Sequence, residues 1–185
     1  MNSNKHEYFL NAVHYCLWLN DMKFGDFIGK IVNILFSPIP KCLFTKEYKK
    51  KYYERIAKQQ SEMEKFFHNK KNGYHIGLAH HWYGYFYSGY PLFISFLLGG
   101  VIIRETGYLS NIMKLVIIAV PVGLCYIPAY RAVFTNKRYL MYFKQFEKEG
   151  KMWHKKWNFI TLIFCIGSII CTILGICAAF AIVIL

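Results

Sequence analysis

Three long apolar stretches without a charged side chain occupy residues 86–103, 115–130 and 158–185. A helix rises about 1.5 Å per residue, so about 20 apolar residues cross a hydrocarbon core of about 30 Å, and about 17 is a working minimum. The second stretch is too short unless its helix begins near Tyr108 or Ser110 and Lys114 extends to the membrane interface. The pattern predicts three transmembrane helices over about 84–103, 110–130 and 158–185.

Shorter apolar segments precede these stretches. Residues 8–19 cannot span a bilayer, and residues 24–44 are interrupted by two charged residues and two prolines, which are Asp26, Lys30, Pro38 and Pro40. We expect two short helices over 24–44, which either lie at the membrane interface or form an ordinary buried pair. A further helix is expected from Thr45, as its N-cap, to about Lys71, before Asn72-Gly73.

The loop between the second and third apolar stretches has an amphipathic pattern. Its aromatic residues fall along one helical stripe, flanked by Lys and Arg: Tyr139, Phe143, Phe146, Trp153 and Trp157. The fold class predicted is therefore an all-α membrane protein with three transmembrane helices and amphipathic cytoplasmic helices. Its regions are a basic helical region at 1–82, a transmembrane hairpin at 83–130, a basic loop helix at 131–157 and a C-terminal transmembrane helix at 158–185.

Composition and charge agree with a membrane protein and add an orientation. Of the 185 residues, 55% are hydrophobic and 18% charged, with 23 Lys and Arg against 10 Asp and Glu. Residues 1–82 hold 13 of the basic residues, 131–157 hold eight and 104–114 hold two. Because Lys and Arg accumulate in cytoplasmic flanks, we expect an inner (plasma) membrane protein with a cytoplasmic N-terminus and a C-terminus outside.

The basic segments predict a surface for anionic lipid headgroups or a protein partner. Its candidate residues are Lys49, Lys50, Lys51, Arg55, Lys137, Arg138, Lys155 and Lys156. Each basic residue near an anionic membrane contributes about 1 kcal/mol of attraction. The positive-inside bias alone also explains this charge, and we expect no specific nucleic-acid partner.

The last stretch carries small residues four apart, at Gly167, Cys171, Gly175 and Ala179. Such a row lets two helices approach closely in lipid. It packs either on the chain's own hairpin, where Gly99 and Gly100 offer a weaker small face, or on a second copy or another membrane protein.

No cofactor is expected from the candidate chemical groups. His75, His80 and His81 are weak metal candidates, because their spacing is poor and Asn72-Gly73 separates them from Glu64 and His68. The six cysteines contain no pair at two-residue spacing: Cys16, Cys42, Cys125, Cys165, Cys171 and Cys177. The three spans also lack the ionisable residues of pumps and proton-coupled transporters.

These observations favour a small, non-enzymatic membrane protein that binds a partner or assists assembly through its basic cytoplasmic face. The alternative is an oligomeric pore or membrane-permeabilising effector, in which the small-residue row faces a neighbouring copy. A membrane enzyme with a histidine-bound metal ranks lower, since such sites require more ligands than the sequence offers.

Overall fold

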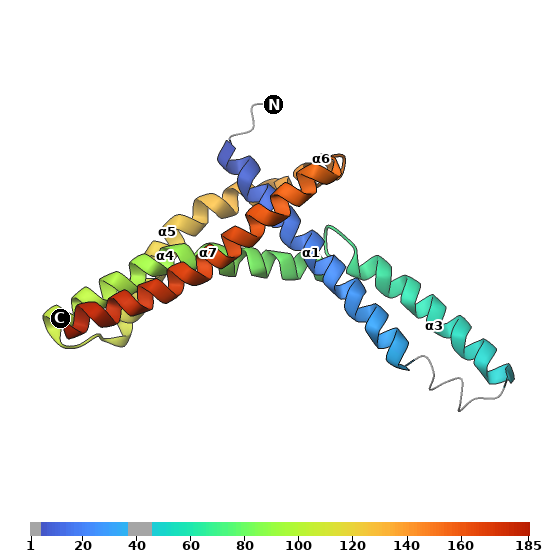
Figure 1. Ribbon diagram of the computed structural model, residues 1–185, viewed down its shortest axis with the longest axis horizontal. Helices are drawn as coiled ribbons and strands as arrows, with labels where there is room; N and C mark the ends of the chain where they lie inside the picture. The colour runs from blue at the N-terminus through green and yellow to red at the C-terminus, as the bar shows by residue number, and fades with distance from the viewer. Residues whose placement is uncertain (1–4, 37–45) are drawn as a thin grey trace. The chain divides into compact units, whose positions relative to one another are not determined.

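The computed structural model describes residues 5–36 and 46–185, which form helices joined by short turns, with no strand among them. The helices are α1 (Lys5–Phe36), α3 (Lys46–Phe67), α4 (Tyr74–Thr106), α5 (Asn111–Val133), the short 3-10 helix η1 (Thr135–Lys137), α6 (Arg138–Phe146) and α7 (Lys151–Ile184) (Figure 1). The expected cap Thr45, together with Cys42, lies outside the described residues. The all-α class predicted from the sequence is confirmed.

Three helices, α4, α5 and α7, are long and apolar enough to cross a membrane, as the sequence predicted. Only 6% of the most apolar 18-residue stretch of the second one is buried within the protein. An apolar helix with so little protein around it is stable only where lipid covers its surface. The chain is therefore an all-α membrane protein with three candidate spans.

The first two spans are joined by a tight turn over residues 107–110. Gly107 adopts φ +69°, a left-handed conformation that costs glycine little, and its N–H donates to the Ile103 carbonyl at 2.8 Å. Ser110 then caps α5, because its hydroxyl accepts from the Met113 N–H at 3.2 Å. The cap explains why the second span begins near Ser110, before its charge-free stretch.

The described residues divide into two compact units. The large unit comprises residues 5–16 and 81–185, and the small unit comprises residues 17–36 and 46–80. Helix α1 thus begins in the large unit and continues into the small one, whereas α4 begins in the small unit and continues into the large one. Each unit is described below by itself.

Two expectations about the polar regions are wrong. The apolar segments at 8–19 and 24–36 belong to one continuous helix, α1, because Asp26 and Lys30 occupy one side of it and do not interrupt its backbone. The part of the expected helix pair beyond residue 36 lies outside the described residues. The aromatic stripe of the 131–157 loop is divided between α6 and α7, since Gly150 has an extended backbone and becomes the N-cap of α7. The two parts of the stripe still contact each other, because the ring of Phe146 stacks on that of Trp153 with 4.8 Å between the centroids.

The core of the large unit surrounds the first part of α1. Every residue from 10 to 16 is buried. Helix α6 covers this segment with its aromatic face, and α7 adds Trp157, whose ring lies 5.6 Å from Tyr8. Polar bonds align the elements, since Asn11 donates to the Ala132 carbonyl at 3.2 Å and Trp153 donates to the Tyr8 hydroxyl at 3.0 Å.

Candidate functional site

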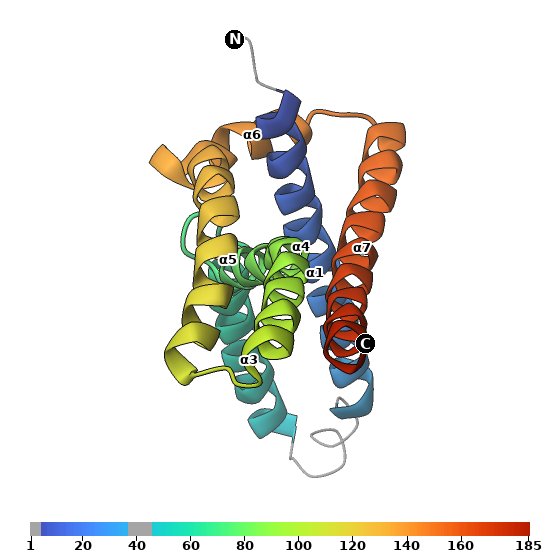
Figure 2. The ribbon, with the colours of Figure 1, turned by 90° about the vertical axis from the view of Figure 1, so that its left-hand side faces the viewer.

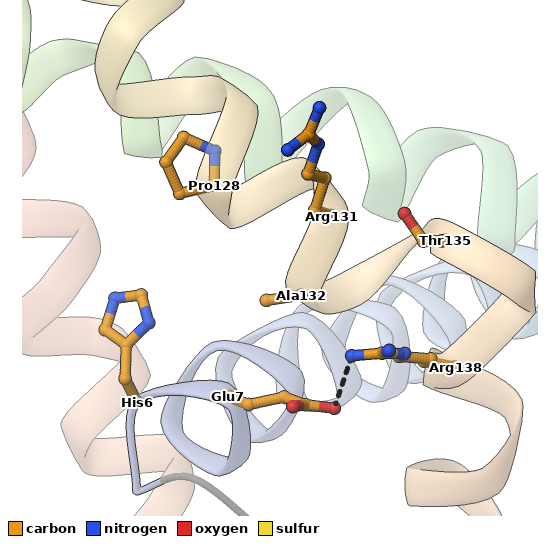
Figure 3. Close-up of a pocket in the computed structure, with 7 residues that line it drawn as sticks. All are labelled: His6, Glu7, Pro128, Arg131, Ala132, Thr135 and Arg138. Atoms are coloured by element: carbon orange, nitrogen blue, oxygen red, sulfur yellow. Dashed lines mark hydrogen bonds and ion pairs between the residues drawn. The ribbon is translucent and has the colours of Figure 1, made fainter.

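A pocket of about 430 Å³ lies where α5 ends in the large unit. Seven residues line it, namely His6, Glu7, Pro128, Arg131, Ala132, Thr135 and Arg138 (Figure 3). Its volume is within the range of small-molecule sites. The first turn of α1 supplies two of these residues, and the chain from α5 through η1 to α6 supplies the others.

Helical spacing explains why these residues share one site. Pro128, Arg131 and Ala132 are separated by three and one positions, which brings them to one face at the end of α5, and Thr135 follows three positions later at the start of η1. Asn136 and Lys137 then adopt φ values of +54°, and this left-handed bend starts α6 in a new direction. The bend brings Arg138 to the opposite side of the pocket.

The pocket is electropositive. Arg138 Nη1 lies 3.4 Å from Glu7 Oε1, so one arginine is partly neutralised. Arg131 is exposed and makes no hydrogen bond or ion pair within the described part of the chain; Figure 3 shows it directed away from the Arg138–Glu7 pair. Guanidinium groups bind carboxylate and phosphate oxygens well, because their fixed N–H donors match the geometry of these anions. The arrangement is suited to an anionic group.

The other basic residues predicted from the sequence are divided between the two units. Lys137, Lys155 and Lys156 are exposed in the large unit, whereas Arg138 is half-buried in its ion pair. Lys51 and Arg55 are exposed on α3 in the small unit. Lys49 and Lys50 belong to α3 by their backbone, and their side chains lie outside the described part of the protein. Sequence reasoning missed His6, Glu7 and Arg131, although Arg131 is the first charged residue after the second span.

The histidine candidates have separate surroundings. In the small unit, Nδ1 of the buried His75 donates to Asp21 Oδ2 at 2.6 Å, and His68 Nε2 lies 3.5 Å from Asp26 Oδ1. His80 also belongs to the small unit, whereas His81 belongs to the large unit, where it stacks on Tyr85. Within residues 5–36 and 46–185, no three His, Cys, Asp or Glu side chains are grouped so that they could hold a metal ion.

A fully buried histidine that the sequence did not single out lies at the centre of the large unit. Four aromatic rings surround His14 at 5.4–5.6 Å between centroids, and they belong to Tyr83, Phe134, Tyr139 and Phe143. The adjacent Tyr15 is buried as well, and burial, followed by the charge of Glu147, raises the pKa of its hydroxyl to about 12. With a neutral phenol and three of the four rings packed edge to face on His14, this cluster is a structural core.

The small-residue row of α7 lies against α4 of the same chain, and Figures 1 and 2 show the two helices side by side. A Cβ on Gly175 would meet Phe93 Cα at 3.0 Å, and one on Gly167 would meet the Tyr90 hydroxyl at 2.9 Å. Ala179 in turn lies against Gly100. The fourth member of the row, Cys171, is half-buried.

Polar groups add to this close packing between α4 and α7. The Tyr90 hydroxyl donates to the Phe164 carbonyl at 2.8 Å, and the Thr172 hydroxyl contacts the Gly89 carbonyl at 3.4 Å. Small residues and such bonds stabilise helix pairs in lipid, where burial of apolar surface provides little drive. The row therefore holds two of the spans together.

The pocket at the end of α5 is thus the site whose chemistry is best defined, whereas the histidine pairs and the small-residue row make contacts between helices of the same chain. Comparison of the chain with protein-family models, with curated proteins and with solved structures gives no significant match.

Proposed function

We propose that the chain is a non-enzymatic, membrane-anchored binding protein whose basic end holds anionic lipid headgroups. The observation that carries the proposal is the pocket at the end of α5, which combines Arg131, without a partner in the described residues, with the partly neutralised Arg138. A basic pocket beside membrane-spanning helices is a recurrent kind of site for phosphate headgroups. The pocket begins where the charge-free stretch of the second span ends, so a headgroup could reach it.

The intramolecular contacts of α7 favour an anchor over a pore. A pore needs the small-residue row for packing between copies, whereas Gly175 and Ala179 already meet Phe93 and Gly100 of the same chain. The stretches 86–103, 115–130 and 158–185 also contain no Asp, Glu, Lys, Arg or His side chain that could line a path for ions. Both observations support a monomeric membrane anchor.

The binding test replaces one arginine in the full-length protein. Arg131→Gln is expected to weaken binding of a fluorescent phosphatidylglycerol to the detergent-solubilised protein by about 5- to 10-fold, because one basic residue contributes about 1 kcal/mol. Phosphatidylcholine should bind the variant and the wild type equally. Titration by thermophoresis measures both affinities.

The matched control is Lys144→Gln, which removes one exposed positive charge from α6 outside the pocket. We expect it to change the affinity less than twofold, since it has no contact with the pocket. An equal loss of affinity in the two variants would show that the net charge alone attracts the lipid, and the pocket would then have no specific role.

The proposed orientation places the pocket in the cytoplasm, with the 107–110 turn outside. It rests on the excess of Lys and Arg in residues 1–82 and 131–157. A cysteine at the exposed Tyr108 should react with a membrane-impermeant thiol reagent on intact cells, whereas a cysteine at the exposed Gln145 should react only after lysis. Both variants are made after replacement of the native cysteines, and the opposite labelling pattern would reverse the orientation.

A further inference from the structure

The part of α1 that belongs to the small unit exposes an unusual amount of apolar surface. Seven large apolar side chains between residues 24 and 35 are 38–72% exposed, namely Phe24, Phe27, Ile28, Ile31, Val32, Ile34 and Leu35. Folded proteins in water seldom leave such a contiguous apolar surface uncovered. The chain accordingly needs an occupant for this face.

The exposed residues recur at helical spacing and share one face of the helix. Positions 24, 27, 31 and 35 are separated by three, four and four residues, the spacing of a continuous apolar stripe, and position 28 lies on the same face, four residues after 24. The opposite side contributes Gly25, Asp26, Gly29 and Lys30 to a groove of about 970 Å³, whose other residues come from α3, the turn after it and the start of α4. The polar side of the helix is therefore turned toward the protein and the apolar side away from it.

Specific contacts hold the helix in this orientation. Asp21 accepts from His75 at 2.6 Å, and Asp26 lies 3.5 Å from His68. The backbone also approaches closely, because a Cβ on Gly25 would lie 2.6 Å from Cε1 of His75. Rotating the helix to bury its apolar face would break both acid–histidine pairs and drive a bulkier side of the helix against His75.

We propose that residues 24–35 of α1 form an interfacial membrane helix, with this apolar face in the acyl-chain boundary of the bilayer. Lipid is the occupant that the chain already requires, since α4, α5 and α7 are long and apolar enough to cross a membrane. Twelve residues of helix extend about 18 Å, which is too short to cross the hydrocarbon core, so the segment lies along the interface.

The charge of the small unit agrees with an interfacial position. Leu17–His80 contains 12 Lys and Arg against six Asp and Glu. A helix with an apolar face beside a basic surface is the usual composition of a helix lying on a membrane. This inference is independent of the pocket at the end of α5, because burial of the apolar face requires no anionic lipid.

The experiment measures immersion with spin labels on the full-length protein in phosphatidylcholine nanodiscs. Labels are placed singly at Phe27→Cys, Ile31→Cys and Lys30→Cys, after replacement of the native cysteines and a check that thermal unfolding is unchanged. All three positions are exposed, so labelling removes no core contact. For each label, we compare two collision rates. One is the rate of collision with oxygen, which concentrates in lipid, and the other is the rate of collision with a nickel chelate, which stays in water.

We expect the ratio of oxygen to nickel collision to be several-fold higher at Phe27 and Ile31 than at the matched position Lys30. Equal nickel accessibility at the three positions would mean that the face lies in water, and the inference would be wrong. Protection of Phe27 and Ile31 from both reagents would show a protein partner or second copy on the face, which also overturns it. Because the nanodiscs lack anionic lipid, failure of the headgroup proposal leaves this result unaffected.

Discussion

Phe143→Ala is expected to lower the free energy of unfolding by about 3–5 kcal/mol, the range for removing a fully buried aromatic ring. The ring has no exposed surface and lies 5.4 Å from His14, 5.0 Å from Tyr15 and 5.6 Å from Tyr139 between centroids. Its removal leaves a cavity between α1 and α6, and the rings packed around it cannot fill this space without losing their own contacts. Unfolding by denaturant in mild detergent, followed by tryptophan fluorescence, measures the change.

Met141→Ala is the control, since it truncates a side chain of the same helix that is 54% exposed. We expect Met141→Ala to lower the free energy of unfolding by less than about 0.5 kcal/mol, as for most surface substitutions. Comparable losses in the two variants would mean that α6 does not hold the large unit together through its aromatic face.

Gly100→Leu is expected to destabilise the pair of α4 and α7 by about 3 kcal/mol, the upper end of the range for overpacking. A Cβ at this position would lie 2.9 Å from the Cα of Ala179 and 3.0 Å from its carbonyl oxygen. These are backbone atoms, so the helices themselves must separate. Gly175→Leu, on the facing helix, should act similarly because its Cβ would meet Phe93 Cα at 3.0 Å.

Gly99→Leu is the matched control, because it makes the same substitution at the adjacent position of α4. A Cβ at Gly99 meets no atom within 4 Å, so Gly99→Leu should leave the thermal unfolding of the monomer almost unchanged. Crosslinked oligomers should be unaffected in all three variants. Loss of oligomers without loss of monomer stability in Gly175→Leu would instead assign the row to contacts between copies.

The limits of prediction from the sequence can be seen in α1. The sequence shows its segment at 24–35 as apolar residues broken by Asp26 and Lys30, and this pattern predicts an interruption of the helix. The structure has one helix through Phe36 because a charged residue in the helix interior costs little when its side chain lies on the polar side. Asp26 does so beside His68.

The three spans and the helical class follow from the amino-acid sequence alone. A span depends on local properties, because the bilayer requires about 20 apolar residues and a helix satisfies their backbone groups without distant partners. The start of α5 at Ser110 also depends on nearby residues only, because the Ser110 hydroxyl accepts a hydrogen bond from the N–H of Met113, three residues later.

The pairing of distant polar residues, by contrast, depends on how the helices pack. Asp21 and His75 are 54 positions apart, and Glu7 and Arg138 are 131 apart. No periodicity in the sequence relates such residues, because their contact depends on how the helices pack and on the left-handed bend at Asn136 and Lys137. The pocket and the inward polar side of α1 are therefore properties of the packed chain, whereas its spans are properties of its segments.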